Sequence, residues 1–176
     1  MRPNGLHERA VIQRESGSTA GLDSAASLRA GVPDLMAAFD AQATRIGATV
    51  HPTRRAEVGP RLAQLLQDAQ CKTVALASGV VRWASIVQAL DGTGLVTVTA
   101  PELRPTHRAD AGISIAKLGV AETGSVLLHS SSEDRRVELC VDVHVVLLDS
   151  AEVVPTLDSA SAVLREIGRA SCRERV

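Results

Sequence analysis

The residues best suited to chemistry lie in one short stretch, Ala121-Glu122-Thr123-Gly124-Ser125, which is followed directly by an apolar run. Glu122 offers a carboxylate that can act as a general base, bind a ligand hydroxyl or form a covalent intermediate. Thr123 adds a hydroxyl, and Gly124 lets the backbone take positive φ or approach a ligand closely. The same residues also suit a turn whose Glu is solvated or bonded to backbone amides. The catalytic and the structural interpretation of Glu122 both stand at this point.

Three further residues are candidates for ligand binding. Ser78 and Gly79 follow an apolar strand, TVALA, and open α/β sheets bind ligands at the carboxyl ends of their strands. Backbone amides there can hold a phosphate or carboxylate, although Ser78 also suits a helix cap. Asp110 lies where the strand pattern changes, and it can bind a ligand or cap a connection, of which we favour the cap. The sequence therefore predicts a cleft in which Glu122 and its two neighbours face the 78–79 turn.

The histidines and cysteines predict no metal site in this chain. His144 lies among valines, which is typical of a core histidine with a hydrogen-bond partner, and it belongs to no His or carboxylate cluster. Cys71, Cys140 and Cys172 show no paired spacing, so we expect no iron–sulfur or zinc site and no disulfide framework. The glycine patterns of dinucleotide and phosphate loops and the GxSxG serine pattern are missing from the sequence.

Composition narrows the class of partner. The 176 residues are 45% hydrophobic but only 1% aromatic, with a net charge of −1. So few aromatics disfavour base stacking, and the lack of a basic tract disfavours phosphate-backbone binding, so we expect no nucleic-acid partner. No apolar run reaches the ~18 residues that span a bilayer, and the first residues lack the apolar core of a signal peptide. We therefore expect a cytoplasmic protein without a membrane span.

Both ends of the chain differ in character from the middle. Residues 1–33 have a Ser/Ala/Gly-rich centre and are expected to be mostly disordered, with one helical turn around Leu6–Gln13. Residues 166–176, EIGRASCRERV, resemble the translation of a common sequencing-library adapter and lack helical apolar periodicity. We therefore expect a non-native tail there, with the native C-terminus missing, and a single domain over residues 34–165.

The pattern of elements predicts an open α/β sheet. Helical periodicity alternates with short apolar strands up to residue 99, which favours a parallel sheet covered on both faces. The expected helices are 35–46, 55–69 and 80–90, and the expected strands are 48–51, 72–77 and 95–99. After Asp110, strand-like segments follow one another without a helix between them, at 111–114, 119–121, 126–128 and 137–148. A polar turn at 131–136 and a closing helix at 151–164 complete the expectation. We predict a mostly parallel sheet flanked by helices, with an added β-hairpin region.

Three blocks of sequence resemble the signature of the LUD-domain (lactate utilisation protein C-like) family. The blocks are Asp110–Ile113 with Gly119–Leu128, then Val143–Val146, and then Val153–Pro155. The resemblance covers roughly Leu35 to Leu164. Ser125 replaces the usual threonine, and Lys117 stands where the family often has an acidic or small residue. The resemblance implies a fold similar to that of sugar-phosphate isomerases, CoA-transferases and 5-formyltetrahydrofolate cyclo-ligases.

The family also implies a function. It implies an accessory or catalytic subunit of a bacterial system that oxidises L-lactate to pyruvate, acting beside iron–sulfur partner subunits that would hold all the clusters. One alternative is a stand-alone enzyme on a small carboxylate or phosphorylated metabolite, such as a cyclo-ligase-like or isomerase-like activity. That alternative needs cationic side chains near the site, and the available ones are Arg82, Arg104, Arg108 and Lys117. A non-catalytic, ligand-binding regulatory domain is the other alternative, so whether the chain is an enzyme stays open.

Overall fold

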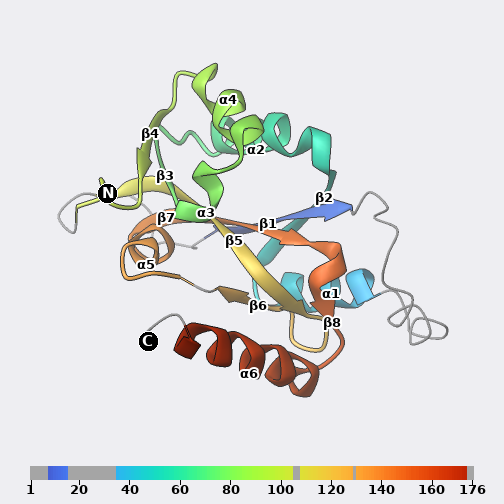
Figure 1. The fold of residues 1–176 in the computed structure, drawn as a ribbon. Coiled ribbons are helices and arrows are strands. Elements are labelled where there is room, and N and C mark those ends of the chain that lie inside the picture. Colours follow the sequence, from blue (N-terminus) through green and yellow to red (C-terminus); the bar gives the residue numbers. More distant parts are fainter. Residues whose placement is uncertain (1–7, 16–34, 105–107, 129, 174–176) are drawn as a thin grey trace, which may run out of the picture.

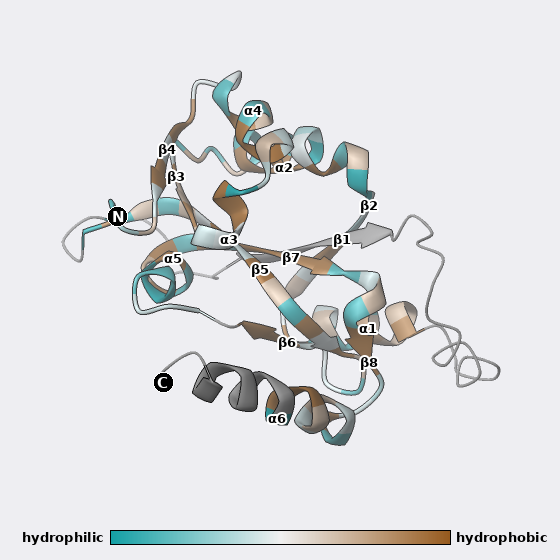
Figure 2. Cartoon of the chain, in the orientation of Figure 1, coloured by the Kyte–Doolittle hydropathy of each residue, from teal (hydrophilic) through white to brown (hydrophobic). Residues whose placement is uncertain are grey.

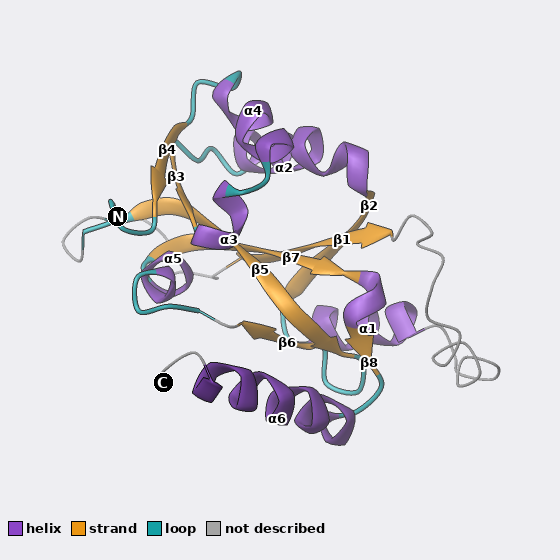
Figure 3. Ribbon diagram, viewed as in Figure 1, coloured by secondary structure: helices purple, strands orange, loops and turns teal. Residues whose placement is uncertain are grey.

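The alternating apolar and amphipathic segments form an open α/β sheet flanked by helices in the computed structural model (Figure 1, Figure 3). The structure describes residues 8–15, 35–104, 108–128 and 130–173, with the backbone alone described in 8–15 and 166–173. The strands are β1 (Glu8–Glu15), β2 (Ala48–Arg54), β3 (Thr73–Leu76), β4 (Val96–Thr99), β5 (Ala109–Val120), β6 (Ser125–Leu128), β7 (Val141–Asp149) and β8 (Val153–Val154). The helices are α1 (Leu35–Arg45), α2 (Val58–Asp68), α3 (Ser78–Val81), α4 (Ala84–Asp91), α5 (Asp134–Leu139) and α6 (Leu157–Arg173), with short 3-10 turns η2 (Arg55–Glu57) and η3 (Ser150–Glu152).

The sheet is mixed but mostly parallel. Its main path runs β2-β1-β7-β5-β3-β4, and every neighbouring pair along that path is parallel. The long strand β5 pairs with β3 and β7 along its first part and with β6 and β8 along its last part. Because β6 runs antiparallel to β5, the two form a hairpin. The predicted fold class, a mostly parallel sheet with an added hairpin region, is confirmed.

Helices cover both faces of the sheet because its strands are apolar on both sides. Val145 and Val146 are neighbours on β7, yet they belong to different buried clusters, as the two-residue period of a strand requires. Val145 packs in the cluster of α2 and α4, which includes Leu62, whereas Val146 packs in the cluster of α1, which includes Phe39. Figure 1 shows α2 and α4 above the sheet and α1 below it. Figure 2 shows apolar residues along β3 and α3 and hydrophilic ones on α5.

The first strand corrects the expectation for the N-terminal segment. Residues 8–15 form β1 between β2 and β7, so the helical turn predicted around Leu6–Gln13 is wrong there. The local sequence gives no clear strand period, but a segment in this position gains parallel ladders on both sides, and these long-range bonds decide its structure. The rest of the predicted disordered segment lies outside the described residues.

The region after the hairpin holds a helix that was not predicted. Residues 134–139 form α5, and β7 begins only at Val141, so the polar turn at 131–136 and the strand from 137 are wrong. Tertiary packing explains the helix: Val137 is fully buried, and α5 lies so close to β5 that a Cβ on Gly112 would overlap the carbonyl oxygen of Val137. The sequence pattern of 134–139 alone does not reveal this contact.

The closing helix also differs from its prediction. Helix α6 begins at Leu157, not near residue 151, because Val153 and Val154 pair with β5 as β8 and Pro155 follows them. The helix then continues to Arg173, well past the predicted end at residue 164. Whether residues 166–176 are native stays a prediction, and residues 174–176 lie outside the described part of the chain.

Candidate functional site

A break in the pairing of β5 creates the best candidate site. The last pair between β3 and β5 joins Leu76 to Ile113, and the first pair between β6 and β5 joins Leu128 to Ala116. Ser114 and Ile115 therefore face a gap at the carboxyl end of β3, where the chain leaves the sheet to form α3. Ligands of open α/β sheets bind in crevices at such carboxyl ends. A cavity of about 330 Å³ lies in this gap, which is enough for a small metabolite.

This β5 crevice gathers residues from three parts of the chain. It is lined by Ala77, Gly79 and Arg82 around α3, by Ser114, Ile115 and Lys117 of β5, and by Ser130, Asp134 and Glu138 in and before α5. Arg82 and Lys117 are exposed, and the side chain of neither forms a hydrogen bond or ion pair with any residue that the structure describes. Their positive charges are therefore available to an anionic ligand.

The two acidic residues of the crevice are already bonded to neighbouring hydroxyl groups. Asp134 accepts hydrogen bonds from the amide of Ser78 at 2.7 Å, from the Ser78 hydroxyl at 3.0 Å and from the Ser131 hydroxyl at 3.1 Å. Partial burial by itself raises the pKa of Asp134, but the bonds from Ser78 and then Ser131 outweigh it, so the pKa lies below its ordinary value. Glu138 accepts a short hydrogen bond from Ser130. These bonds hold the two carboxylates against neighbouring groups of the chain, and neither carboxylate forms an ion pair with Arg82 or Lys117.

A buried serine, Ser114, lines the crevice and is bonded to His144, which is half-buried and does not line the crevice. The hydroxyl of Ser114 lies 2.7 Å from Nε2 of His144, and Ser114 is only 2% exposed. His144 faces a neighbouring hollow, mostly apolar, which Glu138 shares. The structure thus gives His144 the partner expected of a histidine inside an apolar strand. Sequence reasoning missed Ser114, for which the available signal was a polar residue within the apolar run Gly112–Ala116.

The structure does not bring Glu122 to this crevice, so the predicted shared cleft is wrong. Glu122 is exposed, and its carboxylate accepts a hydrogen bond from the amide of Leu157 at 3.2 Å, at the start of α6. The reason is that segments 111–114 and 119–121 belong to one continuous strand. From Ile115 the strand runs on to Val120, which is roughly 16 Å at the usual rise of a strand. The observed contact of Glu122 is a helix cap, and its catalytic role stays a prediction.

Asp110 also lies away from the crevice, at the opposite end of β3. Its Oδ2 accepts hydrogen bonds from the amides of Lys72 and Thr73, each at 2.8 Å. These amides lead into β3, so Asp110 ties the amino ends of β3 and β5 together. The capping role favoured from the sequence is confirmed, and the chain from Thr73 to Ser78, roughly 16 Å at the rise of a strand, separates Asp110 from Ser78.

Thr123 and Gly124 form the turn of the hairpin and pack against α1. Gly124 has a φ of +67°, and a Cβ on it would lie 2.7 Å from Cα of Ala43 and 2.6 Å from the carbonyl carbon of Gln42. Close contact with a helix backbone therefore explains this glycine without a ligand. The Thr123 hydroxyl is buried and has no hydrogen-bond partner among the described residues. Gly124 does line the apolar hollow beside His144, but not the β5 crevice.

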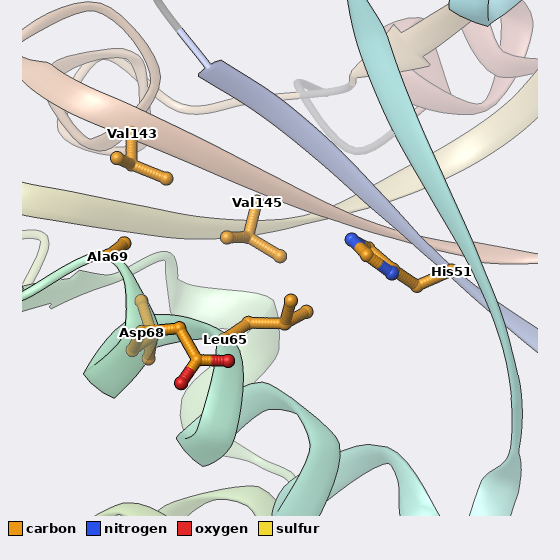
Figure 4. A pocket seen from close by; sticks show the side chains of 7 residues that line it. His51, Leu65, Asp68, Ala69, Val143 and Val145 are labelled. Atoms are coloured by element: carbon orange, nitrogen blue, oxygen red, sulfur yellow. The ribbon is translucent and has the colours of Figure 1, made fainter.

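Another hollow carries less chemistry than the β5 crevice. It lies between α2 and the sheet, with Leu65 and Val145 between His51 and Asp68 (Figure 4). His51 is in the middle of β2, not at a carboxyl end, and its Nδ1 lies 3.3 Å from the guanidinium of Arg61. Within the described ranges, no three His, Cys, Asp or Glu side chains gather closely enough to hold a metal ion.

Comparison with known proteins gives one match. A family model described as LUD domain matches residues 36–175, well over half of the chain. The match begins inside α1 and so does not include β1. Comparison with curated proteins and with solved structures gives no match. No helix within the described residues has the length and apolar character needed to cross a membrane.

Proposed function

Because the chain belongs to the LUD-domain family, which is associated with lactate utilisation, we propose that it binds a small carboxylate in the β5 crevice as a subunit of a bacterial L-lactate oxidation system. The observation that carries the proposal is the position of Arg82 and Lys117. Both cations line one crevice at the carboxyl end of β3, and neither has a partner among the described residues. An anion is the ligand that such a pair attracts.

The charges of the crevice favour a compact anion such as lactate or pyruvate. Arginine binds a carboxylate through two parallel hydrogen bonds, and lysine adds a point charge. Asp134 and Glu138 are the opposing charges, but each already accepts hydrogen bonds from neighbouring groups. Of the four cations considered from the sequence, Arg108 is bound to Asp142 at the other end of β5. Arg104 follows β4 and does not line the crevice.

Electron transfer would belong to other subunits. The sequence contains three cysteines without paired spacing, whereas clusters need several thiolate ligands held together. We therefore propose that iron–sulfur proteins receive the electrons from lactate, while this chain binds the substrate or product beside them. Co-purification with proteins encoded nearby, followed by lactate oxidation with and without this chain, tests the assembly.

The binding step has its own test. Calorimetric titration with L-lactate and with pyruvate should show binding that Arg82→Gln and Lys117→Gln each weaken by about tenfold, because each substitution removes one charge-assisted contact. Arg108→Gln is the matched control, since it removes an arginine that directly precedes β5, at the end of that strand away from the crevice. Equal affinities in all four proteins would refute the crevice as the binding site.

A phosphorylated metabolite is the second candidate ligand, because the same two cations suit a phosphate. This ligand would make the chain a stand-alone enzyme of the cyclo-ligase or isomerase kind. Thermal stabilisation by ATP or by a sugar phosphate, with none by lactate or pyruvate, would favour it. Stabilisation by lactate without turnover in any assembly would instead indicate a regulatory binding domain.

A further inference from the structure

We propose that Ser114, positioned by His144, recognises the oxygen on the carbon next to the carboxylate of the ligand, so that the crevice selects 2-hydroxy and 2-oxo acids. The inference rests on the proposed function, since Arg82 and Lys117 must first hold the carboxylate. It adds a determinant of specificity that neither the sequence pattern nor the family match assigns. It starts from the 2.7 Å contact between Ser114 Oγ and His144 Nε2.

The sheet register fixes this pair. Gly112 of β5 is the register partner of His144 of β7, and Ser114 lies two residues further along the same face. The missing side chain at Gly112 gives α5 its close approach to β5, and α5 carries Asp134 and Glu138 to the crevice wall. The pair therefore sits on two central strands, and its geometry does not depend on a loop.

Ser114 reaches the crevice despite its burial. Ser114 is 2% exposed, yet it lines the same crevice as Arg82 and Lys117. A ligand whose carboxylate is held by the two cations therefore occupies the same crevice that Ser114 lines. A hydroxyl in such an enclosed site distinguishes ligands with and without the matching oxygen more strongly than an exposed hydroxyl does. The reason is that water does not readily take the place of a missing ligand oxygen there, so the unfilled hydrogen-bond position costs free energy.

The pair suits both oxidation states of the ligand. A serine hydroxyl has one donor and two acceptor positions, and a neutral imidazole nitrogen is either donor or acceptor according to its tautomer. When Nε2 of His144 accepts from Ser114, Oγ can accept a hydrogen bond from a ligand hydroxyl. When Nε2 carries the proton and donates to Oγ, the serine can donate to a ligand carbonyl. A carboxylate with neither oxygen leaves Ser114 bonded to His144 alone, with its second hydrogen-bond position unfilled, and sites built around such a bond reject the analogue that lacks it.

Three ligands and two serine variants test the proposal by calorimetric titration. For the unmodified chain we expect L-lactate and pyruvate to bind at least about tenfold more tightly than propionate, which lacks the oxygen. Ser114→Ala should lose that preference by weakening lactate and pyruvate while leaving propionate within about twofold. Ser114→Cys keeps nearly the same shape with a weak hydrogen-bond donor, so it should lose the preference even if the alanine variant folds poorly.

Thr53 provides a matched control on another strand. It is buried, it donates a hydrogen bond to the carbonyl of His51 at 3.0 Å, and it lies on β2 outside the β5 crevice. Thr53→Val removes a buried hydroxyl without changing the shape of the side chain, so the ratio of lactate to propionate affinity should stay the same. A fall in that ratio for Thr53→Val as large as for Ser114→Cys would overturn the assignment to Ser114.

The failures of the two proposals are distinguishable. Equal binding of lactate, pyruvate and propionate by the unmodified chain overturns the specificity of the pair but leaves the carboxylate site standing. A preference that survives in Ser114→Cys also overturns only the role of the pair. No binding of any of the three acids overturns the proposed function, and the inference falls with it.

Discussion

Replacing Gly124 with alanine separates a packing role for this glycine from a ligand-binding role. Gly124 has a φ of +67°, which costs an L-residue about 1 kcal/mol. The new Cβ would also lie 2.6 Å from the carbonyl carbon of Gln42 and 2.7 Å from Cα of Ala43. Both are backbone atoms of α1, so no side-chain rotation relieves the overlap, and overpacking of this kind adds about 1–3 kcal/mol.

The two costs together predict a loss of about 2–4 kcal/mol in the free energy of unfolding. At about 2–4 °C per kcal/mol for a domain of this size, the Tm should fall by about 4–16 °C. Gly94→Ala is the matched control: Gly94 has a φ of +76°, but nothing lies within 4 Å of its Cβ position. It should lose only the backbone term, a fall in Tm of about 2–4 °C.

Thermal and urea unfolding followed by circular dichroism measure both variants. Equal losses for Gly124→Ala and Gly94→Ala would refute the argument from close approach to α1. Titration of folded Gly124→Ala with L-lactate adds a second test, since the β5 crevice does not include Gly124 and affinity should be retained. Lost affinity together with unchanged stability would restore the ligand-binding role predicted from the sequence.

Three other substitutions test single contacts. Asp110→Ala removes the acceptor of the Lys72 and Thr73 amides and should lower the free energy of unfolding by about 1–3 kcal/mol, measured by urea unfolding; no loss would contradict the cap. The pKa of Asp134 is lower in the folded state than its ordinary value of 3.8, so the ionised carboxylate stabilises the fold at pH values above 3.8. This stabilisation is lost as the pH falls through the lower folded-state pKa. Asp134→Asn lacks it, so the free energy of unfolding of that variant, measured by urea unfolding at several pH values, should depend less on acid. Glu122→Gln removes a charge at the start of α6 and should cost about 0.3–1 kcal/mol, read from its Tm. If growth on lactate is intact in cells carrying this variant, the predicted catalytic role of Glu122 fails.

The local sequence was sufficient where each element depends mainly on its own pattern. The helices at 35–45 and 58–68 and the strands at 73–76 and 96–99 follow their apolar periods closely. Asp110 was interpreted as a cap because it lies where the strand pattern changes, and its carboxylate does accept two backbone amides. The fold class follows from these elements, since strands alternating with helices require parallel pairing and helical cover on both faces.

Elements that depend on distant partners were harder to predict. Residues 134–139 form a helix because Gly112 leaves room for Val137 on the sheet. The sequence of 134–139 itself gives no sign of this space, which depends on a glycine more than 20 residues earlier. Residues 8–15 become a strand because they pair with β2 and β7 on both sides. Their positions come from surfaces built by residues far away in the chain.

For the candidate site, the sequence by itself determined which kinds of residue are available and the position of one segment of the site, the 78–79 turn. It placed Ser78 and Gly79 at the carboxyl end of an apolar strand, and Gly79 lines the crevice while Ser78 bonds its wall through Asp134. Only the tertiary structure decided which groups meet there. The unbroken length of β5 carries Glu122 away to α6, and the register of β5 with β7 joins Ser114 to His144 across 30 residues. Strand length and register are set by hydrogen bonds between segments distant in the chain, so they cannot be predicted from the local sequence pattern of one segment.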